Sequence, residues 1–568
     1  MIAFRAQVTN RAAAFVVFAF AALGAVAPAG TARAQGPRGA GPDARTPAAG
    51  TLRAGFGATW TRNAERYEDG IVRELGARFS FAAVGADVVR SLGPVEEATR
   101  VAAGSPTFLA SLGSLATQAR SRFESTPISA EYGITNRFAV GVIVPFATSI
   151  SRVDVVANGV DGSATLGLNP ALVSTSIVDA NGLLLTQMDA AATFLSQRIT
   201  TCGAAPGTPG CGAIVASTAS AQALLTESGA FTAALAALYG GRAGSTGALF
   251  VPLAGSAAQA AIAARLTAMK AQFGAFGAPA IVAGAPVGAP APLTGAEFQR
   301  VIADSTYGII AAPLASVVRR GVGDVDFSAQ YTWHDSYAPP RADAGFVDRL
   351  WWRSALIGVF RLGSGAAAEA DDLIPVAIGQ HQNDIELRSI TDVGLGVHFS
   401  ITTALRYTRQ NATELSVRVP AMPQDAFPEA FRTVTAALDL GDELALELFP
   451  RWSLSEAMSV AAYYGFRRKA EDSWSGTATA IGPDGGSVSL DAGVLSAETG
   501  EREHRFGTSI AYSTLSAWER GGARWPLEIS FSHFQTSAGT GGYVPKVTHD
   551  AVQIRWYWSP FGGGPRRQ

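Results

Sequence analysis

The chain has 568 residues, of which 48% are hydrophobic and 16% are charged, and its formal net charge at pH 7 is −2. This slightly acidic balance excludes a strongly basic nucleic-acid-binding protein. Beyond the N-terminal region, no continuous apolar run reaches the roughly 20 residues that a membrane-spanning helix needs.

The first 34 residues have the organisation of a secretory signal peptide. Arg5 and Arg11 precede an apolar run from Ala12 to Ala27, and Ala32-Arg33-Ala34 supplies small residues for cleavage. The alternative is an N-terminal membrane anchor, but the run is short for a spanning helix and is followed by Gly and Pro. Cleavage after residue 34 removes three arginines and no acidic residue, which shifts the formal net charge from −2 to −5.

Two-residue alternation begins after a short linker, which we assign to residues 35–50. Apolar residues recur at every second position from Thr51 to Thr61, which predicts a first strand. The segment Pro127 to Phe146 predicts a hairpin, because the polar turn Ile134-Thr135-Asn136-Arg137 separates two alternating runs. We therefore expect residues 51–149 to contain the first strands of a sheet, with a long loop between them.

Residues 150–320 have a different composition, rich in Ala, Gly, Ser, Thr and Pro and poor in charge. The low-complexity segment Pro279 to Pro292 reads as a surface linker. Two alternatives remain for the whole insertion: a plug or lid over the mouth of a barrel, or an external loop domain. Two stretches have the spacing of amphipathic helices: Leu184, Met188, Ala191 and Leu195, and then Ile262, Leu266, Met269 and Phe273.

The only two cysteines, Cys202 and Cys211, lie close together in a Gly- and Pro-rich stretch. Their spacing in an exported chain predicts a local disulfide. A metal site is the alternative, but no nearby His or further Cys completes a tetrahedral set, so we expect no bound metal.

Strict alternation returns in residues 321–558. From Gly323 to His334, Val325, Phe327 and Trp333 belong to an apolar face that alternates with a polar one. We expect Pro450-Arg451-Trp452-Ser453 to form a turn. Further strands are predicted at 350–362, 383–393, 396–409, 441–449, 457–468, 503–515, 525–535 and 549–558, with a C-terminal tail at 559–568.

These segments predict an all-β protein, a transmembrane antiparallel β-barrel of about 12 strands with a large, partly helical Ala/Gly-rich insertion. The soluble alternative, a secreted β-sandwich, also alternates, but its outward faces have to be polar. Here the apolar faces repeatedly carry Trp, Tyr and Phe near their ends. We therefore expect a porin-like barrel in the bacterial cell outer membrane, in contact with its lipid.

Several short motifs suggest a family. They are Glu131 to Phe138 running into Val144-Pro145-Phe146, then Gly321 to Val325, Gly379-Gln380 and Asp384 to Leu387. In these motifs the chain resembles the outer-membrane proteins of the phenol meta-degradation pathway, which are similar in turn to the outer-membrane transporters of fatty acids and aromatic hydrocarbons. The long insertion and the C-terminal tail depart from that pattern.

The resemblance implies uptake of small, hydrophobic or aromatic solutes through a barrel, with no catalytic residue and no cofactor. A structural or adhesive barrel is an alternative. A barrel-embedded lipid hydrolase is a weaker one: His398 and Ser400 would share one face of a strand as base and nucleophile, but no third orienting residue is evident. The candidate lumen residues are Asp324, Asp326, Gln330, His398, Ser400, Arg406, Arg467 and Arg555.

Overall fold

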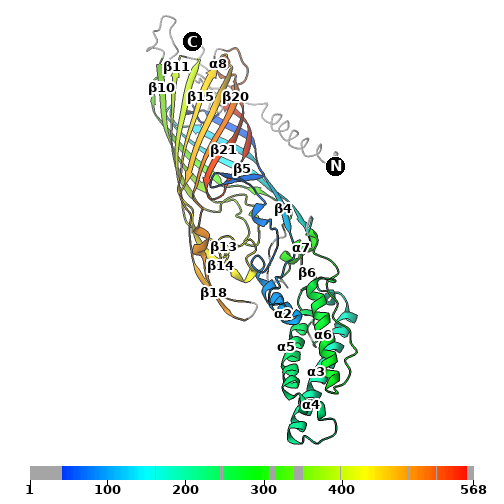
Figure 1. Ribbon diagram of the computed structural model, residues 1–568. Helices are drawn as coiled ribbons and strands as arrows, with labels where there is room; N and C mark the ends of the chain where they lie inside the picture. Colours follow the sequence, from blue (N-terminus) through cyan, green and yellow to red (C-terminus); the bar gives the residue numbers. More distant parts are fainter. Residues whose placement is uncertain are drawn as a thin grey trace.

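The computed structural model describes residues 41–159, 162–243, 245, 247–305, 309, 311, 314–337, 350–396, 398–482, 485–519 and 521–558. The predicted signal peptide and the tail at 559–568 lie outside the described residues. Figure 1 shows a barrel with a group of helices projecting from one end.

Twelve antiparallel strands close into the barrel in the order β4-β1-β23-β21-β20-β16-β15-β12-β11-β10-β9-β5, with β5 returning to β4. Their bounds are β1 Leu52–Asn63, β4 Leu115–Gly133, β5 Phe138–Ala157, β9 Val325–Asp335, β10 Leu350–Leu362, β11 Asp384–Leu395, β12 Phe399–Gln410, β15 Glu443–Ser453, β16 Met458–Lys469, β20 Glu501–Ser513, β21 Leu527–Gly541 and β23 Thr548–Trp558. A further strand, β8 (Val317–Val322), pairs only with β5 and extends the sheet beyond the closed wall. The predicted fold class is confirmed.

The alternation in β9 separates an outer from an inner face, as the sequence predicts. Phe327, Tyr331 and Trp333 are 46–48% exposed, whereas Gln330 and Thr332 are 6% and 3% exposed. A one-residue change of register would exchange these two faces, so the pattern fixes how the strand sits in the wall.

The outer wall of the barrel carries a belt of large apolar side chains. Water disfavours so much exposed hydrocarbon, whereas a bilayer core accommodates it, so the barrel spans a membrane and the β-sandwich alternative is excluded. Six strands each contribute an exposed member to this belt: Leu356, Leu387, Leu405, Trp452, Ile510 and Phe531. Among the described residues, no helix is long and apolar enough to cross a membrane.

Aromatic rings pack against one another near one end of this belt. The ring centroids of Trp333 and Trp352 are 5.3 Å apart, and those of Phe399 and Trp452 are 5.2 Å apart. Such a girdle is typical of the interface between the hydrocarbon core and the lipid headgroups.

The same end of the barrel carries the short turns and both ends of the sheet, where Leu52 pairs with Trp558. Ile134 donates its N–H to the carbonyl of Phe138 in the turn predicted between β4 and β5. Short turns and chain ends mark the periplasmic side of a barrel, and long loops mark the extracellular side. The helices therefore lie on the extracellular side.

One predicted turn is wrong. The segment Pro450-Arg451-Trp452-Ser453 belongs to β15, in which Pro450 pairs with Ile401 and Arg451 is 3% exposed. The chain turns only after Ser453, where Leu454 donates its N–H to the carbonyl of Met458. Proline lacks an N–H and therefore suggests a turn, but here the wall accommodates it within a strand.

Smaller elements cover the extracellular mouth. One small sheet consists of β13 (Thr413–Arg418), β14 (Thr433–Asp439) and β17 (Ser473–Ser475). A second consists of β2 (Glu65–Glu68), β3 (Ile71–Glu74) and β22 (Val544–Pro545). β18 (Thr477–Ile481) forms a hairpin with β19 (Ser487–Asp491), and in the helical domain β6 (Leu166–Leu168) pairs with β7 (Phe250–Pro252) across the intervening helices. Short 3-10 helices are η1 Ala77–Phe79, η2 Arg90–Leu92, η3 Pro170–Leu172, η6 Ala430–Arg432 and η7 Ala492–Ser496, and α8 (Leu515–Glu519) lies at the periplasmic end.

The insertion folds into a helical domain beyond the loops, outside the barrel lumen (Figure 1). Its helices are α3 Thr175–Ala204, α4 Gly212–Ala216, α5 Thr218–Tyr239, α6 Ala257–Ala275 and α7 Gly295–Ala303, joined by α2 Gly93–Ala103 from the earlier loop. Both predicted helical stretches are confirmed, and their eight apolar residues belong to one buried core. The sequence did not single out α5, because alanines on all sides obscure its apolar stripe.

Two details of this domain concern its loops. Cys202 and Cys211 form a disulfide that links the end of α3 to the start of α4. The segment from Pro279 to Pro292 is irregular but does not act as a surface linker: Ile281 and Ala289 are 8% and 0% exposed. Its small residues allow the backbone to lie against the neighbouring chain.

The face assignment in β9 can be tested by substituting adjacent residues. Ala329 lies on the outer face in the middle of the strand, so Ala329→Arg should lower the free energy of unfolding by about 2–4 kcal/mol, the cost of a cation near the bilayer midplane. Ser328→Arg, on the inner face, should cost far less. Denaturant titration of both variants in lipid vesicles measures the difference, and equal costs would contradict the assignment.

Candidate solute pathway through the barrel

The inner wall carries ion pairs across several strands towards the extracellular end. Arg361 on β10 contacts Asp326 on β9 with an Nε–Oδ1 distance of 2.9 Å and approaches Asp384 on β11 to 3.6 Å. Arg388 pairs with Glu386 on the same strand, and Arg406 on β12 pairs with Glu447 on β15. The partners neutralise one another, so the wall is polar while few of its charges lack a counter-ion.

Among these inward-facing arginines, Arg467 on β16 has the most carboxylate partners. Its guanidinium lies 2.9 Å from Glu443, 2.5 Å from Glu501 and 3.2 Å from Glu503. Glu503 is 1% exposed and also pairs with Arg505 at 2.7 Å. One planar guanidinium with five N–H donors can serve several carboxylates at once, which joins three neighbouring strands.

Towards the periplasmic end, the chain preceding β1 lies inside the lumen. Ala44 is 0% exposed; its N–H donates to Asp392 on β11 at 3.1 Å, and its carbonyl accepts from the Thr332 hydroxyl on β9 at 2.8 Å. The Thr402 hydroxyl holds the other oxygen of the Asp392 carboxylate at 2.6 Å. We call residues 41–49 the lumen segment.

The methyl group of Ala44 packs on an apolar patch of the inner wall. This patch, which we call the apolar seat, consists of Ala355, Ile357, Val359, Ile390 and Ala404 from three adjacent strands. Apolar side chains facing a polar lumen would be exposed to water if the lumen segment left, so their burial contributes to holding it in place.

Charges fix the lumen segment to the opposite side of the barrel. Asp43, whose side chain is 7% exposed, lies 3.5 Å from Arg555 on β23, 3.8 Å from Arg53 on β1 and 3.7 Å from Arg45. Because β1 and β23 lie across the lumen from β10 and β11, the segment bridges the barrel and obstructs it.

Contacts with the β4–β5 turn complete the attachment. Thr46 donates its hydroxyl to the carbonyl of Asn136 at 2.9 Å, and the Ala49 N–H donates to the Asn136 side chain at 3.0 Å. Gly41 lies against the Phe449 ring so closely that a Cβ there would stand 2.9 Å from a ring carbon. A larger residue at position 41 would displace one of the two.

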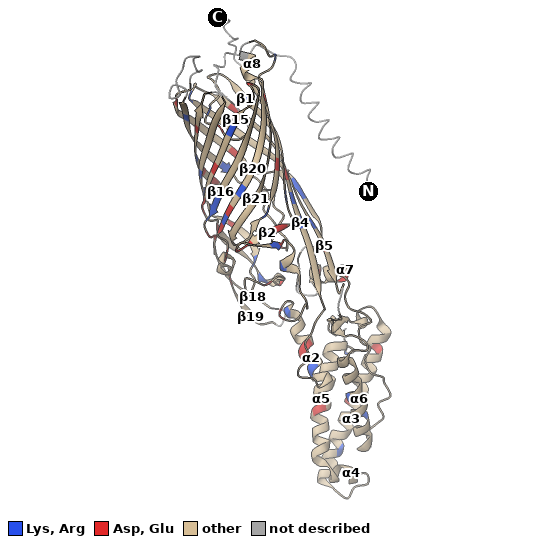
Figure 2. Cartoon of the chain, turned by 45° about the horizontal axis from the view of Figure 1, so that its top comes forward, with Lys and Arg blue, Asp and Glu red and all other residues tan. Residues whose placement is uncertain are grey.

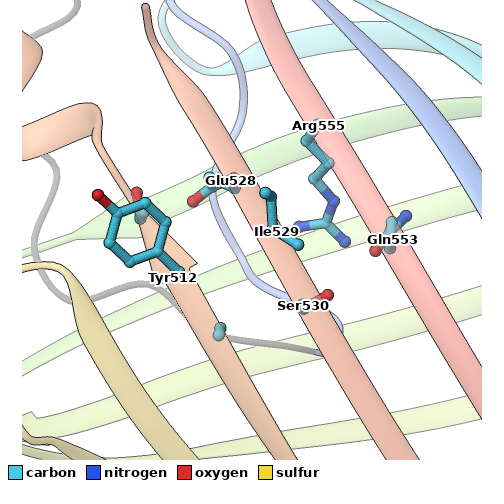
Figure 3. Close-up of a pocket in the computed structure, with 8 residues that line it drawn as sticks. Tyr512, Glu528, Ile529, Ser530, Gln553 and Arg555 are labelled. Carbon is cyan, nitrogen blue, oxygen red and sulfur yellow. The ribbon is translucent and has the colours of Figure 1, made fainter. Parts of the chain in front are cut away.

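A small pocket of about 10 Å³, the space of roughly one water molecule, lies beside Arg555 at the periplasmic end. Figure 3 shows Arg555 and Gln553 on β23 near Glu528 and Ser530 on β21. The Tyr557 hydroxyl donates to Glu528 at 2.5 Å. The pocket therefore presents both hydrogen-bond donors and hydrogen-bond acceptors next to the lumen segment.

The structure places the predicted lumen residues in different settings. Asp326, Arg406, Arg467 and Arg555 belong to the inner ion pairs described above. Gln330 also faces inward, and its Nε2 has no hydrogen-bond partner among the described residues. Asp324 instead fastens a loop, since it accepts from the N–H groups of Gly365 and Gln380.

His398 and Ser400 are not brought together as base and nucleophile. His398 is exposed in the turn before β12, and Ser400 is 2% exposed inside the wall. No hydrogen bond joins the two side chains in the described structure. Within the described residues, no three His, Cys, Asp or Glu side chains gather as metal ligands would.

Sequence reasoning missed the lumen segment, which it assigned to the linker at 35–50. The segment is too short for a periodic pattern, and its small and polar residues resemble those of any linker. The one available signal was Asp43 and Arg45 on either side of Ala44, which is weak evidence for a buried contact.

No protein-family model matches the sequence, and no curated protein matches it. Among solved structures, the chain is similar to an outer membrane channel from Pseudomonas putida F1, with 8% identity, coverage of 91% of this chain and 98% of that one, and a TM-score of 0.38. Its closed twelve-strand wall and exposed apolar belt make the chain an outer-membrane β-barrel.

Two further similar structures are a Pseudomonas aeruginosa FadL homologue and a mutant of the TodX monoaromatic hydrocarbon channel. The first has 8% identity, coverage of 94% and 99%, and a TM-score of 0.28; the second has 8% identity, coverage of 91% of each chain, and a TM-score of 0.24. Autotransporter barrels are similar at comparable scores. At such scores the function has to be argued from the residues of this barrel.

Adjacent arginines allow a test of the inner ion pairs. Arg467→Met should lower the free energy of unfolding by about 3 kcal/mol, because it leaves inward-facing carboxylates without their shared cation. Arg468→Met, on the outer face, should change it by no more than about 0.5 kcal/mol. Denaturant titration in lipid vesicles compares the two, and similar values would contradict the role given to Arg467.

Proposed function

We propose that this protein is an outer-membrane channel for small solutes with an apolar or aromatic body, which the lumen segment closes. The observation that supports this function is the position of Ala44, on the apolar seat and between the two sides of the barrel. Movement of this short segment, which precedes β1 and belongs to no strand of the wall, would open the lumen without breaking the wall.

The inner surface suits a solute that has an apolar body and a polar group. The apolar seat offers Ile357, Val359 and Ile390 to an apolar or aromatic body once Ala44 has moved. Polar partners lie close by, with Asp392 next to the seat and Arg555 in the periplasmic pocket. A solute with a hydrocarbon body and one polar group would satisfy both, whereas a sugar would leave the seat unoccupied.

A second candidate is a structural or adhesive barrel. The observation that favours it is the helical domain, which projects beyond the loops and whose core rests on the extracellular ends of β4 and β5 (Figure 1). Conductance distinguishes the candidates, because an adhesive barrel needs no path through its lumen.

Single-channel recording in a planar bilayer tests whether the lumen segment closes the channel. A mature chain that begins at Ala49 should conduct continuously, whereas the mature wild-type chain should be closed for most of the time. Replacement of residues 160–291 by a short flexible linker is the control and should leave the wild-type pattern unchanged, because the helical domain lies outside the lumen. Silence of the truncated chain would contradict the channel function.

The apolar seat can be tested with solutes in the same recordings. In the truncated chain, phenol should block the current at lower concentrations than glycerol does. Ile357→Thr should weaken the block by phenol several-fold without closing the channel, since it removes apolar surface from the seat. Leu356→Thr, on the lipid face of the same strand, is the control. Equal effects of both substitutions would exclude the seat as a solute site.

A further inference from the structure

The outer face of the β4–β5 hairpin changes character where the hairpin leaves the barrel. Within the wall this face is apolar, with Ile128 on β4 and Phe146 on β5 both exposed. Further along the same face, towards the extracellular side, the exposed residues include Arg122 and Arg120 on β4 and Arg152 and Asp154 on β5. Figure 2 shows basic residues on this part of β4 and β5, between the barrel and the helices.

These arginines stand directly opposite one another. Arg120 pairs in register with Arg152 across β4 and β5, and Arg62 on β1 pairs in register with Arg122. Arg120 and Arg122 are two residues apart and so share a face, which groups the four side chains into one patch on three neighbouring strands. We call Arg62, Arg120, Arg122 and Arg152 the arginine patch.

Like charges directly opposite each other destabilise a sheet unless an anion lies between them. Two members have counter-ions in the chain: Arg62 pairs with Asp550 at 2.5 Å, and Arg122 pairs with Glu124. Arg120 and Arg152 have no hydrogen bond or ion pair with any described residue. Of the two opposed arginine pairs, the pair on β4 and β5 is thus the one without an ion-paired carboxylate.

The level of the patch identifies the anion. Trp60 lies two residues from Arg62 on the same face of β1, at the edge of the apolar belt. The patch begins where the lipid-facing surface ends, on the extracellular side, which is the level of the headgroups of the outer leaflet. Phosphate is the common anion of lipid headgroups, and guanidinium groups bind it through paired N–H donors.

We propose that the arginine patch binds phosphate groups of outer-leaflet lipids. Among the described residues, the exposed Asp154 forms no ion pair with Arg120 or Arg152, and a phosphate between these two arginines supplies their counter-ion. The neighbouring pair, Arg62 and Arg122, adds to the field that attracts it. Bound lipid would hold the hairpin that carries the helical domain against the membrane surface.

The test uses the full mature chain in vesicles that contain a labelled lipid. The probes are bisphosphorylated lipid A and the same lipid without its phosphates, each in phosphatidylcholine. The wild-type chain should retain the phosphorylated lipid preferentially. Arg120→Gln combined with Arg152→Gln should weaken this retention about thirtyfold, as expected for two cations at an anionic surface.

Arg242→Gln combined with Arg300→Gln is the matched control, because it removes two exposed arginines from the helical domain. It should retain the lipid as the wild-type chain does, and the mobility shift between unheated and heated samples on gels verifies that all variants are folded. Equal retention by the two double variants, or equal retention of both lipids, would overturn the proposal. Release by millimolar inorganic phosphate would also overturn it, because the patch would then bind free phosphate instead of lipid.

Discussion

The structure depends on one constraint: no backbone polar group can remain unpaired inside a membrane. A sheet meets this constraint only by closing on itself, and here the first strand, β1, pairs with the last strand, β23, so that every strand of the wall has two neighbours. Closure then forces each strand to present alternate residues to lipid and to the interior. The apolar belt, the inner ion pairs and the position of the lumen segment all follow from that division.

The interior has to be filled or wetted, and this barrel does both. Inward-facing charges are paired across adjacent strands, as in the contacts of Arg467 with Glu443 and Glu501, so the wall is polar and its arginines have carboxylate partners. At the periplasmic end, protein replaces water: the lumen segment covers the apolar seat with Ala44 and places Asp43 among arginines. The lumen segment therefore contacts both sides of the barrel but is not part of any strand of the wall.

The sequence predicts the wall well because the physics of the wall is local. The alternation from Gly323 to His334 and the turn between β4 and β5 can both be recognised from residues that are close together in the sequence. The turn predicted at Pro450 was wrong because whether a strand can accommodate a proline depends on the strands that pair with it. Arg467 could be assigned to the lumen, but its partners on β20 depend on register. The lumen segment had no periodicity at all, and its role arises only from enclosure.

The lumen segment links the start of the barrel region to its end. Residues 41–49 precede β1, whereas Arg555, which pairs with Asp43, lies on the last strand, β23. The barrel closes where β1 pairs with β23, so this seam brings Arg555 beside the lumen segment that precedes β1. The salt bridge between Asp43 and Arg555 thus joins the two ends of the barrel from within, and this contact of the lumen segment is complete only once the last strand is in place.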